Sequence, residues 1–338
     1  MPVPFILDTD TAQDDCIAII AAVLDPEADL RALTMVAGNV SFDQQVRNAH
    51  VTLNALGRLG QVPIHLGCRQ PMVVPWVSAE NVHSDGSGGL SMDFEGTTTE
   101  TEHAVDALIR MAAEAPGQLS VVAIGPLTNI AMAAVKDPAF VRNVRQVVIM
   151  GGSNNGRGNI TPAAEFNFYV DPHAAKVVFE AGFDITVIPW APLTLNDAVF
   201  SRQQLSEIEA LGTPLSELFL RVCASTLAFD ESVGIAGTTH PDSLSVAVLL
   251  NPALVLEAAD YHVAVEAESE LTRGYSSMSW GVHGLAPNAR VIERVDAVGF
   301  HRYLTGLLAT PTEPDRPLRS GVPLGVHPPP TTWGLLHG

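Results

Sequence analysis

The chain has 338 residues, which is long enough to bury a large core as one α/β domain or as two smaller domains. Hydrophobic residues make up 47% of it and charged residues 16%, which excludes a mainly disordered protein. Its net charge of −19 disfavours a nucleic-acid partner, because binding to nucleic acid depends on Lys and Arg side chains that neutralise phosphates.

Strand-like and helix-like segments alternate along the chain. The first half of the chain is expected to form strands at 3–7, 30–37, 119–124 and 147–150 and helices at 16–20, 42–59 and 127–135. The second half is expected to form strands at 185–188, 261–265 and 289–292 and helices at 172–181 and 297–308. This alternation predicts a mainly parallel, Rossmann-like open sheet with helices on both faces. No repeat or linker divides the sequence, so we expect a single domain over 1–309 followed by a proline-rich tail over 310–338.

Four aspartates stand within eight residues directly after the first expected strand, in the segment DTDTAQDD: Asp8, Asp10, Asp14 and Asp15. Carboxylates this close cannot all stay ionised without a nearby cation. Hard divalent cations prefer oxygen ligands, so the segment indicates a Ca²⁺ or Mg²⁺ site. Its position between a strand and a helix is where open α/β folds bind their ligands.

Other polar loops follow the later strands. They are Gly38-Asn39, the segment GPLTN at 125–129, and Gly151-Gly152 followed by Asn154, Asn155 and Asn159. Each loop alone indicates little more than a turn. Because parallel strands place their carboxyl ends along one edge of the sheet, we expect these loops to converge on one cleft.

The ordered motifs resemble those of nucleoside hydrolases of the inosine-uridine-preferring family. They are ILDTDTAQDD, VAGN ending at Asn39, NVHSDGSGGL around His83, GPLTNIA, MGG from Met150, PAAEFNFYVDP, HPDSLSVAVLLNP and PNARV. They extend over nearly the whole chain except the tail. The resemblance implies the nucleoside hydrolase fold and the hydrolysis of the N-glycosidic bond of ribonucleosides to a free base and ribose.

The resemblance also implies a site, residue by residue. Ca²⁺ is expected on Asp10, Asp15, the backbone carbonyl of Ile124, and Asp242. The substrate-binding residues implied are Asp14, Asn39, His83, Met150, Asn159, Glu165 and Asn167. Breaking the bond builds positive charge on the sugar ring, which carboxylates and amide oxygens stabilise. The metal lowers the pKa of its bound water, and Asp10 is the expected base that takes its proton.

Two departures from the better-known members concern the loop and the leaving base. Thr11-Ala12 stands where the usual pattern has Pro-Gly between the acids. A histidine that serves as general acid directly precedes the metal aspartate in many relatives, whereas Pro241 stands there here and His240 is displaced by one residue. His240 is therefore not assigned this role. Other candidates near the base are His83 and His283 and the aromatic residues Phe168, Phe229 and Trp280.

Structural roles remain open for several of these residues. Glu165 and Asn167 could cap or brace a loop, and Asp242 could be the N-cap of a helix over 244–250. Asp8, at the end of the strand, is expected to support the loop rather than to bind the metal.

Two alternative functions also remain. Asp8-Thr9-Asp10-Thr11 resembles the start of aspartate-nucleophile phosphatases, but these need a later lysine beside the phosphoryl group, and the chain has only Lys136 and Lys176. A ribose or nucleoside sensor without turnover is the non-enzymatic alternative.

The cellular setting is the last expectation from the sequence. The longest apolar stretch, 16–24, is too short to span a bilayer, and no basic segment precedes an apolar run at the N-terminus. The three cysteines are scattered and odd in number, which suits a reducing cytoplasm. We expect a cytoplasmic enzyme of nucleoside salvage with no membrane partner. The resemblance implies a homodimer or homotetramer.

Overall fold

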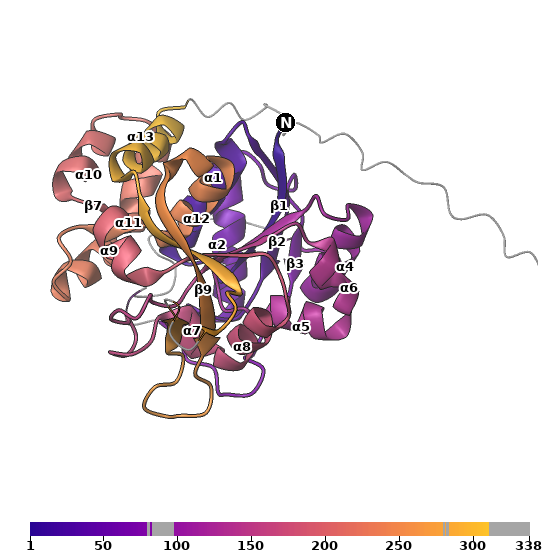
Figure 1. The fold of residues 1–338 in the computed structure, drawn as a ribbon. Coiled ribbons are helices and arrows are strands. Elements are labelled where there is room, and N and C mark those ends of the chain that lie inside the picture. Colours follow the sequence, from indigo (N-terminus) through magenta and orange to yellow (C-terminus); the bar gives the residue numbers. More distant parts are fainter. Residues whose placement is uncertain (80–81, 83–97, 280, 282–283, 311–338) are drawn as a thin grey trace, which may run out of the picture.

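A nine-stranded sheet forms the centre of the computed structural model, which describes residues 1–79, 82, 98–279, 281 and 284–310 (Figure 1). The strand order is β10-β9-β11-β6-β5-β4-β1-β2-β3. The strands are β1 (Val3–Thr9), β2 (Ala28–Met35), β3 (Ile64–Leu66), β4 (Ser120–Ala123), β5 (Val147–Met150), β6 (Ile185–Ile188), β9 (Val255–Val265), β10 (Ser276–Ser279) and β11 (Ala289–Val295). A separate two-stranded sheet pairs β7 (Val199–Phe200) with β8 (Thr238–Thr239).

The sheet is mainly parallel, which confirms the expected fold class. All neighbours from β3 through β11 pair in parallel, and the last two strands, β9 and β10, pair antiparallel at one edge. The central strands are apolar and buried on both sides, as parallel strands covered by helices must be. Their carboxyl ends therefore meet at one edge, where the polar loops begin.

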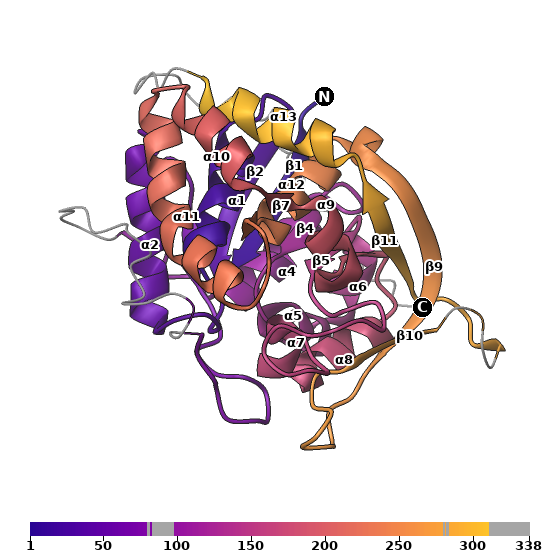
Figure 2. The same cartoon turned by 90° about the vertical axis from the view of Figure 1, so that its left-hand side faces the viewer.

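Helices cover both faces of the sheet (Figure 1; Figure 2). Alternate side chains of β1 divide between the two cores, with Phe5 and Leu7 on one face and Ile6 on the other. The first core takes α1 (Gln13–Leu24), α2 (Phe42–Ala55), α10 (Arg202–Glu209), α11 (Pro214–Ser232), α12 (Pro241–Leu250) and α13 (Ala297–Leu308), and the second takes α4 (Ala104–Glu114), α5 (Thr128–Lys136), α6 (Pro138–Asn143) and α8 (Pro172–Glu180). Shorter helical segments are also present: α7 (Phe166–Val170), the π-helix Trp190–Thr194, α9 (Leu195–Asp197) and the 3₁₀ helix Pro252–Leu254.

The elements that were expected differ from the observed ones mainly at their ends. The helix expected over 42–59 ends at Ala55, and the strands expected at 261–265 and 289–292 are parts of the longer β9 and β11. The sequence did not predict ten of the α-helices and β-strands that the structure describes: β3, α4, α6, α7, α9, β7, α10, α11, β8 and β10. The expected domain boundary at 309 stays a prediction, since the tail beyond Thr310 lies outside the described residues. Within the described ranges no helix is both long and apolar enough to cross a membrane.

Candidate active site

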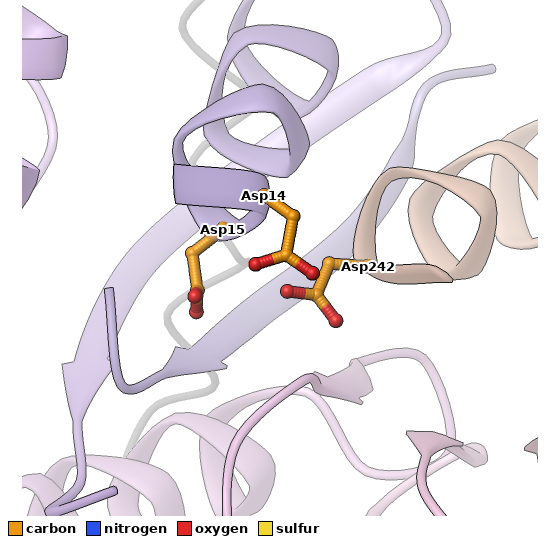
Figure 3. A group of neighbouring side chains, drawn as sticks. All are labelled: Asp14, Asp15 and Asp242. Atoms are coloured by element: carbon orange, nitrogen blue, oxygen red, sulfur yellow. The ribbon is translucent and has the colours of Figure 1, made fainter. Parts of the chain in front are cut away.

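Three aspartates meet where two helices begin. The strand β1 ends at Thr9, and the chain turns through Asp10 to Ala12 before α1 starts, which places Asp14 and Asp15 in the first turn of α1. Asp242 lies in the first turn of α12, and Figure 3 shows its carboxylate directed toward that of Asp14, with Asp15 beside them. One oxygen from each of the three carboxylates lies within 4.8 Å of the others. Helix N-termini favour anionic side chains, so both helices support this cluster.

Asp10 lies completely buried between two glycines. A Cβ atom at Gly38 would be 1.9 Å from Asp10 Oδ2, and one at Gly125 would be 2.7 Å from Oδ1. The backbone N–H of Asn39 donates to Oδ2 over 2.8 Å, whereas Oδ1 is buried without a hydrogen-bond partner among the described residues. A buried carboxylate oxygen without a partner is costly. A bound cation would satisfy it.

The electrostatics of the cluster also call for a cation. Burial, followed by the charge of Asp15, raises the pKa of Asp10 well above its usual range, and burial together with the neighbouring aspartates does the same to the pKa of Asp242. Burial and the charge of Asp15 raise the pKa of Asp14 to about 7. None of the ion pairs formed between described residues involves any of these carboxylates. The donor set consists of oxygens alone, which fits a hard divalent cation.

Hydrogen bonds hold Asp15 in place. Its Oδ1 accepts from the Thr9 hydroxyl over 2.6 Å, and its Oδ2 accepts from the Ala12 backbone N–H over 2.9 Å and from the Asn39 side-chain amide over 3.2 Å. The loop that carries Thr11-Ala12 in place of Pro-Gly thus supplies a direct contact to this carboxylate. Asp15 is therefore fixed by β1, by its own loop and by the loop after β2.

Asp8 lies in β1, and hydrogen bonds hold one of its two carboxylate oxygens. Its Oδ2 accepts from the Thr34 hydroxyl over 2.6 Å and from the Asn129 side-chain amide over 2.8 Å. The same Asn129 amide donates to the Met35 carbonyl, and its oxygen accepts from the Cys68 backbone N–H. Asn129, at the start of α5, therefore joins β1, β2 and the loop after β3. The sequence indicated only a strand–helix connection there.

A pocket opens above the cluster, and residues from both halves of the chain line it. The lining residues are Asp14, Asn39, Ala79, Val82, Ile124, Met150, Asn159, Ile160, Glu165, Phe166, Asn167, Trp190, Thr226, Phe229, Asp230, Thr239, Pro241 and Asp242. All of the expected substrate-binding residues are among them except His83, which lies outside the described residues. Of the expected metal ligands, Ile124 and Asp242 also line the pocket, whereas Asp10 and Asp15 are not among the lining residues.

The Ile124 carbonyl and the polar residues near it are joined by hydrogen bonds. The Asn167 side-chain amide donates to the Ile124 carbonyl over 2.8 Å and to the Met150 carbonyl over 3.2 Å. Glu165 is the N-cap of α7 and accepts from the Asn167 and Gly152 backbone N–H groups, each over 2.8 Å. The structural role that the sequence left open for Glu165 is thus present. Both of its carboxylate oxygens accept backbone hydrogen bonds, and the residue lines the pocket at the same time.

Several candidates near the leaving base require correction or lie outside the description. His240 is buried in the core between Phe200 and Phe219, with ring centroids 4.5 and 5.3 Å away, and neither ring nitrogen has a hydrogen-bond partner among the described residues. Burial lowers the pKa of His240 to about 3, so its imidazole is neutral near pH 7. His240 is not among the residues that line the pocket. His283 and Trp280 lie outside the described residues.

Two further expectations were wrong in detail. Asp242 is not the N-cap of its helix, because His240 holds that position and Asp242 follows Pro241 in the first turn. Phe168 is not available to a base, because it is fully buried against the glycines of the Gly151-Gly152 turn. Phe229 does line the pocket, and so do Phe166 and Trp190, which the sequence did not single out.

Comparisons with known proteins agree with this site. The profile of the family described as inosine-uridine preferring nucleoside hydrolase matches residues 5–302. A pyrimidine-specific ribonucleoside hydrolase, RihA, from Citrobacter koseri is 34% identical over 313 residues, covering 91% of this chain and 99% of the relative. Among solved structures, the plant nucleoside hydrolase PpNRh1 superposes with a TM-score of 0.85 at 28% identity, covering 92% of this chain and 100% of that one. A purine-preferring ribonucleoside hydrolase from Gardnerella vaginalis superposes with a TM-score of 0.82 at 27% identity, covering 90% and 98%. The chain therefore belongs to the inosine-uridine preferring nucleoside hydrolases, enzymes that hydrolyse the N-glycosidic bond of ribonucleosides.

Proposed function

We propose that this enzyme hydrolyses ribonucleosides in a Ca²⁺-dependent reaction that uses Asp10 as its general base. The observation that carries the proposal is the buried, unpartnered Oδ1 of Asp10 beside the cluster of Asp14, Asp15 and Asp242. Buried carboxylates accumulate in this way only where a cation or a catalytic task compensates their desolvation.

Asp10, Asp15, Asp242 and the Ile124 carbonyl are the groups that would hold the ion. Ca²⁺ takes roughly six to eight oxygen ligands, which leaves coordination positions for water and for a vicinal diol such as that of ribose. When bound, the ion supplies positive charge that lowers the pKa of a water molecule and neutralises the buried carboxylates. Calcium is proposed rather than magnesium because the donors come from three separate segments, the β1–α1 turn, the end of β4 and the start of α12, and Ca²⁺ accepts irregular coordination more readily than Mg²⁺ does.

The protein groups then have separable tasks. Asp10, with Oδ1 free of hydrogen bonds, accepts the proton of the attacking water. Asp14, Asn39, Asn159, Glu165 and Asn167 line the pocket above it and would orient the ribose hydroxyl groups. The carboxylates below the ring stabilise the positive charge that develops on the sugar as the bond breaks. The nearly complete burial of this floor keeps bulk water away from that charge.

The leaving base has no histidine acid at the position where many relatives carry one. Pro241 lines the pocket there and has no proton to donate from its side chain. This enzyme's relatives differ in the base that their names give as preferred: RihA is described as pyrimidine-specific and the Gardnerella enzyme as purine-preferring. We propose that the base is recognised instead by the wall of the pocket that α11 and β8 form.

We further propose that the enzyme works in the cytoplasm in nucleoside salvage, as a homodimer or homotetramer. The cysteines support a reducing compartment, because Cys16, Cys68 and Cys223 are all free thiols. Sedimentation of the purified protein tests the oligomeric state independently of activity.

The test is base release from inosine, adenosine, guanosine, uridine and cytidine, followed by chromatography. Each nucleoside is incubated with protein that contains Ca²⁺, with protein treated with a chelator, and with chelated protein to which Ca²⁺ has been returned. We expect release that disappears on chelation, returns with Ca²⁺, and is absent in the Asp10→Ala variant. Binding of a nucleoside without release from any of the five would instead support a sensor.

A further inference from the structure

Asp230 is the charged side chain of the pocket that the proposed mechanism does not use. It lies near the end of α11 and is buried, with 4% of its surface exposed, yet it lines the pocket. Thr226, Phe229 and Asp230 are spaced three and four residues apart, so they lie on one face of the helix. That face is the part of the wall that α11 contributes.

The position of α11 relative to the sugar site follows from its contact with α1. Gln13, at the start of α1, hydrogen-bonds to Ser225 of α11, and the two helices lie next to each other (Figure 2). Asp230 is close enough to Asp14 for its charge to raise the pKa of Asp14. The wall formed by α11 therefore stands beside the sugar site, where the base of a bound nucleoside would lie.

One oxygen of Asp230 is held and the other is free. Oδ2 accepts from the Thr239 backbone N–H over 2.8 Å and from the Thr239 hydroxyl over 2.9 Å. Oδ1 forms no hydrogen bond within the described part of the chain, and it is not enclosed by protein atoms as Asp10 Oδ1 is. Thr239 thus fixes the carboxyl group and leaves one acceptor for a ligand.

The surroundings make that acceptor selective. Burial raises the pKa of Asp230 to about 6 against the opposing effect of the two Thr239 hydrogen bonds, so the group is mostly ionised at pH 7 and can only accept. Its neighbours Phe229 and Pro241 are apolar and offer the base a stacking surface. The two hydroxyl groups in the same wall already donate elsewhere, that of Thr226 to the Cys223 carbonyl and that of Thr239 to Asp230 itself.

We propose that Asp230 is a specificity-determining residue that selects nucleosides whose base carries an amino group at C4 of a pyrimidine or C6 of a purine, which means cytosine or adenine and not guanine, whose amino group is at C2. An amino N–H donates to the free Oδ1, as in other carboxylate contacts with the cytosine amino group. The bases that carry a carbonyl oxygen at the same ring position, uracil and hypoxanthine, would place that oxygen against a carboxylate. Leaving a buried polar group unpaired is what allows such sites to discriminate. This inference rests on the proposed nucleoside hydrolase function.

The test compares kcat/KM for cytidine with uridine, and for adenosine with inosine, in the Ca²⁺-loaded enzyme and in Asp230→Asn. Asparagine keeps an oxygen for both Thr239 bonds and replaces the free oxygen by an N–H₂ donor, so the wall should stay in place. We expect the wild-type enzyme to prefer the amino base in the pair it cleaves by roughly 10- to 100-fold, the range of a hydrogen bond to a charged group. The Asn variant should lose or reverse that preference.

Asp197→Asn is the matched control. Asp197 accepts the Val295 backbone N–H over 2.9 Å and lies outside the pocket, so its variant should retain the wild-type preference. If Asp230→Asn lowers kcat/KM for both members of a pair by the same factor, Asp230 only braces β8 and the inference fails. If the wild-type enzyme cleaves the pair without preference, the inference also fails while the hydrolase function stands. If no nucleoside is cleaved at all, the proposed function fails and this inference falls with it.

Discussion

Replacing Gly38 by alanine tests the position of the proposed base without touching its chemistry. The new Cβ would lie 1.9 Å from Asp10 Oδ2, and contacts below 3.0 Å are essentially never seen, so the carboxylate must move by about 1 Å. Gly38 does not have a positive φ, so alanine can adopt its backbone conformation. The strain falls on Asp10 and on the Asn39 N–H bond that holds it.

The expected loss follows from that displacement. A misplacement of about 1 Å in a catalytic group costs on the order of 100-fold in rate, so kcat/KM should fall by about that factor or more. Overpacking a rigid site costs about 1–3 kcal/mol of stability, which leaves most of the protein folded. The Ca²⁺ affinity should fall in the same variant, because Asp10 is a proposed ligand.

The assay combines steady-state hydrolysis of a cleaved nucleoside, calorimetric titration with Ca²⁺, and urea unfolding. Gly306→Ala is the matched control, since Gly306 lies in α13 and a Cβ there meets nothing within 4 Å. It should leave kcat/KM and Ca²⁺ affinity unchanged and stabilise the helix by up to about 1 kcal/mol. A Gly38→Ala enzyme with wild-type kcat/KM and Ca²⁺ affinity would refute the placement of Asp10.

Three further perturbations probe the surroundings of the site. Removing Ca²⁺ should lower the Tm, and by more at pH 8 than at pH 5, because protons compete with the metal for the carboxylates; calorimetric scans at both values check this. His240→Phe should retain activity and flatten the pH dependence of stability measured by urea unfolding. The pKa of His240 is about 3 in the folded protein, below the 6.5 of an ordinary histidine, so the unfolded chain takes up the proton first as the pH falls. In the wild-type protein the stability that depends on a neutral His240 is therefore lost as the pH falls from 6.5 to 3. Asn129→Ala should cost about 3 kcal/mol and reduce kcat/KM as well, because Asp8, Met35 and Cys68 lose their shared partner. The first prediction is wrong if removing Ca²⁺ lowers the Tm equally at pH 8 and pH 5. The second is wrong if His240→Phe leaves the pH dependence of stability unchanged, and the third if Asn129→Ala is destabilised but fully active.

The sequence predicted the parallel sheet and the place of the site because both depend on local patterns. Apolar runs marked the central strands, and the carboxyl ends of parallel strands necessarily share an edge. The same patterns could not place α11, which packs against α1, α10, α13 and β8. Of the pocket wall that this helix forms, the sequence singled out Phe229 but not Asp230.

The roles of two buried polar side chains also could not be predicted from the sequence. His240 has a polar side chain beside a metal-binding motif, yet it packs between two phenylalanines. Asn129 belongs to a turn motif, yet its side chain joins β1, β2 and the loop after β3. Both roles depend on contacts between residues that lie far apart in the sequence, which only the folded chain specifies. Phe166 and Trp190, now seen to line the pocket, carried no signal that set them apart from core aromatics.

The central claim is that Ca²⁺ and the sugar share the floor of this pocket. A crystal structure of the Asp10→Asn variant and of the wild-type enzyme, each grown with Ca²⁺ and ribose, tests it most directly. In the wild-type crystal we expect one ion in contact with Asp10, Asp15, Asp242 and the Ile124 carbonyl, and with two ribose hydroxyl groups. An ion bound elsewhere, or ribose bound in the pocket with no ion between it and these carboxylates, would contradict the account.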